Sequence, residues 1–315
     1  MVRLQQLAIG ACLFAAVSCS EPTPKESAEA MERVVIKPGF ISLNDLNTFE
    51  SAGSSISLID VRKKSKYVLG HLPLARQVYR PSIQREDLPY EGAAISRLKF
   101  ELLLDSLGVK PNDWIVAYDD KGGSDAARFC WLARLYGHSK ATVLDGGLNY
   151  YALSNTLDTN DVKIKHSGYK YPDSPQNHYI ISTEELQLAL EDSSIVLLDT
   201  RSLDEYSGAR MQSGASRPGH IPGSILFDWG NCVQMDSDYL LKSPKFIQYM
   251  LKELGISPED KVITYCHTGV RSSHTMSVLR DHLGYTNVRN YDGSWCEWSF
   301  RSELPVETDV LLLED

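Results

Sequence analysis

Apolar residues recur along the chain in short runs that predict buried strands. Runs with few polar interruptions occupy residues 115–117, 195–198 and 262–265. Such runs are typical of strands that are covered on both faces of a sheet. Stretches with a helix-like pattern follow them, at residues 124–136, 244–254 and 272–283. Strands that alternate with helices predict an α/β fold with a mainly parallel sheet.

A polar stretch divides the chain into two parts. Residues 151–179 are rich in Asp, Asn, Lys and Pro and show no clear period. We interpret residues 153–178 as a linker between two domains, at 34–152 and 179–315. A chain of 315 residues is long enough for two domains of ordinary size, and its 43% apolar content can supply two cores.

The two predicted domains repeat one another, and a repeat changes how the whole fold is interpreted. Four segments of the first match four of the second in the same order: 59–62 with 198–201, 70–73 with 219–222, 115–118 with 262–265, and 144–147 with 291–294. Matched positions lie 139 to 149 residues apart, a spread that insertions in loops explain. We therefore predict a duplicated α/β domain.

The N-terminal residues form a separate unit. In residues 1–18 the only charge is Arg3, and residues 7–17 are almost wholly apolar, which suits the core of a signal peptide. The four residues that end at Cys19 resemble a bacterial lipobox, and residues 19–33 suit a polar tether. We expect export, lipidation of Cys19, and a periplasmic or cell-envelope location with the lipid as the only membrane contact. The alternative is an ordinary cleaved leader in which Cys19 is incidental.

The acidic composition excludes some classes of function. The formal charge is −9, and loss of the single positive charge of the leader makes it −10. Nucleic-acid binding needs a basic face, so we do not expect it. An anionic substrate must therefore be drawn by local arginines and N–H groups. None of the six cysteines forms a C-x-x-C pair, so we expect neither a metal nor a cofactor.

The run from Cys266 to Arg271 carries the most specific chemical signal. It reads Cys-His-Thr-Gly-Val-Arg and lies between a predicted strand and a predicted helix. Backbone N–H groups converge in such a loop, and the positive end of the helix dipole lies behind them, so the loop can hold an anion. The same field lowers the pKa of a thiol, and the thiolate is the nucleophile. The alternative is a buried structural cysteine.

The length of this loop narrows the chemistry. The pattern is C-x4-R, whereas cysteine-dependent phosphatases use C-x5-R, whose additional residue makes room for a phosphate. A shorter loop is a tighter cradle, matched to one sulfur atom carried on the cysteine. The loop resembles that of the rhodanese-type sulfurtransferases.

Further segments extend the resemblance to two-domain members of this family. They are Asp199-Thr200-Arg201 with Glu205-Tyr206, the turn at residues 219–224, and the Tyr-Asp-Gly-Ser-Trp-x-Glu-Trp signature at residues 291–298. In such members an inactive N-terminal copy packs against an active C-terminal copy. Here Asp119 stands at the position equivalent to Cys266. A carboxylate cannot carry a persulfide, so we predict that the first domain is catalytically silent and that the cleft lies near the domain interface.

The resemblance implies a double displacement. Cys266 thiolate would take sulfur from thiosulfate or 3-mercaptopyruvate as a persulfide, and cyanide or a thiol would accept it, with ping-pong kinetics. The loop N–H groups would stabilise the terminal sulfur; the predicted binding residues are His267, Thr268, Gly269, Val270 and Arg271. The alternatives are that Arg271 only bonds a neighbouring carboxylate, and that His267 is a solvated side chain.

Other residues receive roles from the same resemblance. Arg210 and Arg217 lie where mercaptopyruvate enzymes of the family bind the substrate carboxylate, and either could be a plain surface charge. Structural support is expected from Asp199, Arg201, His220 and Trp295, with Arg201 paired to Glu205.

The donor and the mode of action stay open. The loop mixes features of both donor types, and basic groups at both of its ends, His267 and Arg271, favour the dianionic thiosulfate. One rival is a non-catalytic persulfide carrier or sensor that binds a partner protein, and another is a phosphatase. We expect a monomer that works on small-molecule donors and acceptors.

Two further cysteines invite an interpretation. Cys130 is expected on a buried helix face. Cys296, inside the signature motif, either packs as a spectator or traps oxidised Cys266 as a disulfide.

Overall fold

The computed structural model describes residues 37–308, and it contains two sheets whose paired strands all run parallel. The first has the order β1-β5-β4-β2-β3 and the second β6-β10-β9-β7-β8. The strands of the first are β1 Gly39–Ile41, β2 Ile56–Asp60, β3 Arg76–Gln77, β4 Trp114–Tyr118 and β5 Ala141–Leu144. Those of the second are β6 Ile180–Ile181, β7 Ile195–Asp199, β8 Ile225–Leu226, β9 Lys261–Tyr265 and β10 Val288–Tyr291. The predicted α/β duplication is confirmed, since the two strand orders are the same.

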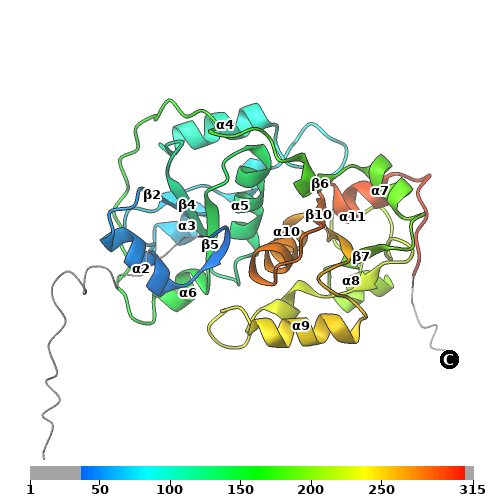
Figure 1. Ribbon diagram of the computed structural model, residues 1–315. Coiled ribbons are helices and arrows are strands. Elements are labelled where there is room, and N and C mark those ends of the chain that lie inside the picture. Colours follow the sequence, from blue (N-terminus) through cyan, green and yellow to red (C-terminus); the bar gives the residue numbers. More distant parts are fainter. Residues whose placement is uncertain (1–36, 309–315) are drawn as a thin grey trace, which may run out of the picture. The chain divides into compact units, whose positions relative to one another are not determined.

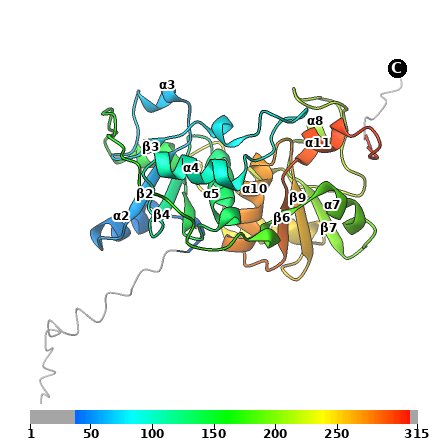
Figure 2. The ribbon, with the colours of Figure 1, turned by 90° about the horizontal axis from the view of Figure 1, so that it is seen from above.

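Helices cover both faces of each sheet (Figures 1 and 2). In the first half they are α2 Leu43–Ser51, α3 Lys64–Tyr67, α4 Arg97–Ser106, α5 Ser124–Tyr136 and α6 Gly147–Tyr151, with the 3-10 turn η1 Arg80–Ile83. In the second half they are α7 Thr183–Ala189, α8 Leu203–Ser207, α9 Pro244–Glu253, α10 Val270–Ser277 and α11 Ser294–Phe300, with the 3-10 turns η2 Asn177–Tyr179 and η3 Trp229–Cys232 and the π-helical turn η4 Val278–His282.

The helix predicted at 124–136 is confirmed, and the one predicted at 272–283 begins earlier, at Val270. Gly269 causes the earlier start, because its left-handed φ of 74° turns the chain directly into the helix.

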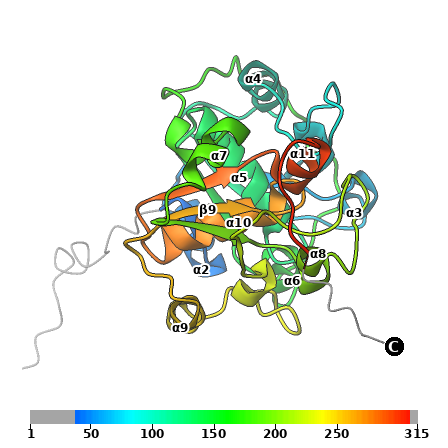
Figure 3. The ribbon, with the colours of Figure 1, turned by 90° about the vertical axis from the view of Figure 1, so that its right-hand side faces the viewer.

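One apolar core runs through both halves. It contains Phe129 of α5 and Met276 of α10, together with Leu251 of α9. Helices α5 and α10 lie side by side between the two sheets (Figure 1). On the outer face of the second sheet, α7 and α11 cover a separate cluster that includes Leu186 and Trp298 (Figure 3). The active-site helix of one half is therefore packed against the corresponding helix of the other.

The predicted linker is held against the first half. It carries no helix between residues 153 and 176. The carboxylate of Asp105 accepts hydrogen bonds from the N–H groups of Ser167, Gly168 and Tyr169 at 2.6–3.1 Å. The Tyr169 side chain is buried.

The predicted leader, the tether and Cys19 lie outside the described residues. Between residues 37 and 308, no helix has both the length and the apolar character that a membrane crossing needs.

Candidate active site

Cys266 lies at the carboxyl end of β9, at the base of the loop that leads into α10. The residue is 1% exposed. Its thiol is 3.6 Å from the Ser272 hydroxyl. The backbone N–H groups of Thr268 and Ser272 also favour its ionised form. The loop therefore surrounds the sulfur with donors, as an anion cradle requires.

The signature motif at residues 291–298 fixes the backbone of this loop. The Cys266 N–H donates to the Ser294 hydroxyl at 3.2 Å, and the Cys266 carbonyl accepts from the Trp295 N–H at 2.9 Å. Ser294 has a φ of 52°, a strained conformation for a residue other than glycine. Its hydroxyl in turn donates to the Tyr291 carbonyl at 2.8 Å. The motif thus holds the nucleophile in place through its backbone.

The electrostatic surroundings favour the thiolate. Burial by itself would raise the pKa of Cys266, but the positive charge of Arg271 and the N–H groups of the loop outweigh it, so the pKa lies below the usual value. Burial raises the pKa of Cys130, Cys232 and Cys296 to about 12 in each case. Among the cysteines in residues 37–308, Cys266 alone is shifted toward the reactive form.

Arg271 is held by a carboxylate of α8. Its two terminal nitrogens donate to Glu205 at 2.7 and 2.8 Å. Burial works against ionisation of Glu205, but the bonds from Arg271 outweigh it and lower the pKa of Glu205 to about 2. Arg271 therefore pairs with Glu205 and also supplies the positive charge that lowers the pKa of Cys266. Arg210 reaches the same carboxylate at 3.4 Å and is half exposed.

The predicted pair between Arg201 and Glu205 is wrong. Arg201 bonds Asp199, two residues before it, with its shortest contact at 2.6 Å, and donates to the Gly219 carbonyl at 2.8 Å. Its guanidinium lies 4.6 Å from the ring centre of Trp295. Asp199 is the last residue of β7, so its carboxylate faces the following turn. Arg201 lies in that turn and pairs with Asp199 instead of Glu205.

His267 is a buried residue rather than a solvated one. Its Nε2 lies 2.8 Å from the Ser213 carbonyl, which can only accept, so Nε2 carries the proton. Burial lowers the pKa of His267, so the ring is neutral near pH 7. The expected second cationic group of the loop is therefore not His267. Cys296 Sγ lies 3.4 Å from the same Nε2, and its backbone N–H donates to the His267 carbonyl.

Arg217 and His220 both have structural places. The Arg217 guanidinium donates to four carbonyl groups, and it does not line the pocket described below; the acceptors are Trp298, Ser299, Arg301 and Leu304. His220 is buried, stacks on Tyr206 with ring centres 3.7 Å apart, and bonds the Tyr206 carbonyl. Neither side chain is aimed at a bound anion.

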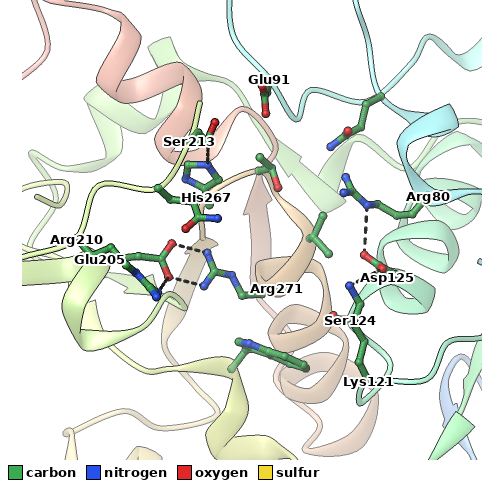
Figure 4. Close-up of a pocket in the computed structure, with 15 residues that line it drawn as sticks. Arg80, Glu91, Lys121, Ser124, Asp125, Glu205, Arg210, Ser213, His267 and Arg271 are labelled. Atoms are coloured by element: carbon green, nitrogen blue, oxygen red, sulfur yellow. Dashed lines mark hydrogen bonds and ion pairs between the residues drawn. The ribbon is translucent and has the colours of Figure 1, made fainter. Parts of the chain in front are cut away.

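A pocket of about 620 Å³ opens beside the Cys266 loop, and both halves line it (Figure 4). The second half contributes Glu205, Arg210, Gln212, Ser213, Trp229, His267, Thr268, Val270 and Arg271. The first half contributes Arg80, Gln84, Glu91, Lys121, Ser124 and Asp125. The sequence predicted a cleft near the domain interface, but no motif marked the first-half residues that line it.

Arg128 is a further residue that the sequence did not reveal. It lies on α5, is fully buried, and donates to the carbonyls of Gly92 and Gly269 at 2.9 and 3.4 Å. It also pairs with Asp292 at 2.5 Å. Gly269 is required here, since a Cβ on it would lie 2.8 Å from an Arg128 nitrogen. The first half therefore contacts the Cys266 loop directly through Arg128.

The equivalent loop of the first half holds a carboxylate instead of a thiol. Asp119 is 1% exposed and accepts four backbone N–H groups at 2.8–3.3 Å. The donors are Lys121, Gly123, Asp125 and Ala126. Burial and the nearby charge of Asp125 raise its pKa, and the N–H groups act in the opposite direction. This cradle is already occupied by the protein's own side chain.

Comparison with known families agrees with this geometry. The family model described as the rhodanese-like domain matches residues 43–154 and again residues 182–300. The chain belongs to the rhodanese family. Each half of the duplication is thus one rhodanese-like domain, as the resemblance predicted.

Two curated relatives of this rhodanese are named thiosulfate sulfurtransferase. The chain is 34% identical over 250 residues to the thiosulfate sulfurtransferase of Pseudomonas aeruginosa, covering 79% of this chain and 90% of that protein. It is 33% identical over 277 residues to the thiosulfate sulfurtransferase of Azotobacter vinelandii, covering 87% and 97%.

Solved structures share the fold. The crystal structure of YnjE matches with a TM-score of 0.75 at 24% identity, over 86% of this chain and 68% of that one. The anaerobic ergothioneine biosynthesis enzyme of Chlorobium limicola matches with a TM-score of 0.74 at 21% identity, over 84% of this chain and 69% of that one. Likeness at this level of identity concerns the fold alone.

Residues 37–308 hold no cluster of three or more His, Cys, Asp or Glu side chains arranged to bind a metal.

Proposed function

We propose that this rhodanese transfers the outer sulfur of thiosulfate to a sulfur acceptor through a persulfide on Cys266. The observation that carries the proposal is the environment of Cys266: a buried thiol with a lowered pKa, bonded by the N–H groups of Thr268 and Ser272, beside a pocket with one positive charge in excess. The class of the activity, sulfurtransferase, agrees with the family and with the names of the relatives.

The first half-reaction forms the persulfide. The Cys266 thiolate attacks the outer sulfur of thiosulfate and a new S–S bond forms. The S–S bond of thiosulfate breaks, and its electron pair leaves with sulfite. A dianion must approach a thiolate in this step, so the charge of Arg271, with the more exposed Arg210 beside it, reduces the repulsion.

The second half-reaction returns the enzyme to its starting state. Cyanide or a thiolate attacks the outer sulfur of the persulfide, and the electron pair of the broken bond returns to Cys266. The terminal sulfur of the persulfide is anionic, and the N–H groups of the loop lie where they would stabilise it. Two half-reactions that share one covalent intermediate predict ping-pong kinetics.

Thiosulfate is the preferred donor in this proposal. The curated relatives named above are thiosulfate sulfurtransferases. Arg217, one of the two arginines expected to bind a mercaptopyruvate carboxylate, is occupied by four carbonyl groups. 3-Mercaptopyruvate is therefore the second choice.

The test uses the purified protein without its leader. It is incubated with thiosulfate or with 3-mercaptopyruvate, cyanide is added, and thiocyanate is measured, with Cys266→Ser as the control. We expect thiocyanate that depends on Cys266 and forms faster from thiosulfate. A folded protein with an alkylatable Cys266 that yields thiocyanate from neither donor would instead be a persulfide carrier.

We also propose that Cys19 is lipidated after export, which rests on the sequence pattern alone. Radiolabelled palmitate should enter the full chain in a bacterial host and should not enter Cys19→Ala. Equal labelling of both chains would contradict the proposal.

A further inference from the structure

One wall of the pocket comes from the half that carries no nucleophile. Arg80 of η1 and Lys121, Ser124 and Asp125 at the start of α5 lie opposite Arg271 and Glu205 (Figure 4). The reaction at Cys266 does not by itself explain why these first-half residues line the pocket. Thiosulfate has five heavy atoms, and at about 30 Å³ for a water-sized group these need about 150 Å³. The pocket, at about 620 Å³, has room for a larger molecule.

On each wall, two cations share one carboxylate. On the second-half wall Arg210 and Arg271 share the single carboxylate of Glu205. On the first-half wall Arg80 and Lys121 share the single carboxylate of Asp125, at 3.3 and 2.8 Å. Each wall therefore has one positive charge in excess of its paired carboxylate.

Glu91, the remaining carboxylate of the pocket, lies against Gly214 of the second half rather than against Arg80. The pocket as a whole therefore has one positive charge in excess, and the excess on the first-half wall is local to Arg80 and Lys121 beside Asp125.

Arg80 has hydrogen-bonding capacity to spare. Its Nε and Nη1 atoms are buried and have no hydrogen-bond partner among the described residues, and the 3.3 Å contact to Asp125 is only an ion pair. Figure 4 shows the guanidinium directed from the first-half wall into the pocket. Buried guanidinium N–H groups without partners are costly, and an anion that reached them would remove that cost.

We infer that Arg80 and Lys121 bind an anionic group on the acceptor, which makes a thiol with a carboxylate or similar anion the preferred class of acceptor. The inference rests on the proposed function and extends it. The excess charge beside Arg271 serves the donor, and the excess charge on the opposite wall serves the acceptor. The silent half thus takes part in substrate selection.

The chemistry of the second half-reaction explains the need for this charge. The acceptor thiolate attacks the outer sulfur of the Cys266 persulfide, a bond forms between these sulfurs, and the bond to Cys266 breaks. The electron pair returns to Cys266 as a thiolate, and the acceptor leaves as a persulfide. Two anions meet in this step, and an anionic tail adds a third negative charge. Cations that hold the tail reduce the repulsion and orient the attacking sulfur.

Three acceptors that carry a different polar group two carbons from the thiol test the inference: 3-mercaptopropionate, 2-mercaptoethanol and cysteamine. The protein is loaded with thiosulfate, desalted and mixed with one acceptor, and the remaining persulfide is measured by cyanolysis. The unloading rate is compared between the wild type, Arg80→Gln, and Arg80→Gln/Lys121→Gln. Arg85→Gln is the matched control, because the Arg85 side chain is exposed, hydrogen-bonds only Asp87 among the described residues, and does not line the pocket.

Loss of charged hydrogen bonds to the tail should lower the unloading rate with 3-mercaptopropionate by about tenfold in the double variant, and by less in Arg80→Gln. Unloading by 2-mercaptoethanol and cysteamine, and loading by thiosulfate, should stay within about twofold. The inference would be overturned if the unloading rate fell equally with all three acceptors, if the loading rate fell as much, or if unloading by 3-mercaptopropionate did not change. The proposed function would stand in each of these cases. A wild type that forms no Cys266 persulfide with any donor would overturn the proposed function as well.

Discussion

The two strand-to-helix loops of this duplicated fold handle an anion in opposite ways. In the first loop, four backbone N–H groups converge on the carboxylate of Asp119. In the second, the donors surround the Cys266 sulfur. The second residue of the following helix is Asp125 in the first half and Arg271 in the second. The first loop binds a carboxylate of the protein itself. The second is arranged to bind an anion from solution.

Two sets of supporting contacts are repeated in both halves. Arg62 donates to Asp60 at 2.6 Å and to the Gly70 carbonyl at 2.8 Å, the same distances that Arg201 makes in the second half. His71 stacks on Tyr67 with ring centres 3.7 Å apart, as His220 does on Tyr206. The supporting architecture is therefore common to both halves, and activity depends on a few residues in one loop.

The largest effect on activity is expected when the thiol is removed from the second loop or placed in the first. Cys266→Ser should lower thiocyanate formation at least about 1,000-fold, because the thiolate is the only group in the loop that can carry sulfur. Adding Asp119→Cys to this variant should not restore it, because Asp125 stands where the second loop has Arg271. Recovery to within about tenfold of the wild type would mean that the two loops are interchangeable.

Removal of the internal anion tests the silent loop itself. Asp119→Ala leaves four N–H groups without their acceptor, so the free energy of unfolding should fall by about 3 kcal/mol. Urea denaturation measures this change. Asp87→Ala serves as the control, since Asp87 is exposed and pairs with an exposed Arg85, and it should change stability by no more than about 0.5 kcal/mol. Equal effects of the two substitutions would show that the cradle contributes nothing.

The charge of Arg271 at the start of α10 should control how the reactivity of Cys266 depends on pH. Arg271→Gln removes the cation that lowers the pKa of Cys266, so that pKa should rise and less thiolate should be present at low pH. We expect kcat/KM for thiosulfate to fall by about 100-fold at pH 6.5 and by less at pH 9.

The rate of alkylation by iodoacetamide, measured against pH, reports the pKa of Cys266 directly. Its midpoint should move upward in Arg271→Gln and stay near the wild-type value in Arg210→Gln. An unchanged midpoint in Arg271→Gln would remove Arg271 from the account of thiol activation.

The smallest effect concerns the support that one half gives to the other. Arg128 and Arg134 both lie on α5, are buried, and reach across to the second half. Arg128→Met removes contacts to the active loop and should lower kcat/KM about tenfold in protein that is still folded. Arg134→Met removes contacts to Ser277 and Asp281. It should destabilise the protein to a similar extent and leave activity within about twofold. Equal losses of activity would reduce Arg128 to a general packing role.

The duplication and the α/β class could be predicted from the sequence, and so could the candidate nucleophile. These features depend on residues close together in the chain. A strand needs only its own apolar run, and the cradle at Cys266 needs only a strand, a short loop with Gly269 and a following helix. The same locality explains why the sequence could place Asp119 at the position equivalent to Cys266.

The tertiary structure alone decided which charges meet. Glu205 pairs with Arg271, 66 residues away in the chain, while Arg201 takes the nearer Asp199. Burial makes His267 neutral, and four carbonyl groups occupy Arg217. Arg80 and Lys121 reach the pocket only because α5 packs beside α10. Such pairings depend on distances and burial that arise when remote elements pack, and a linear pattern of residue types contains neither.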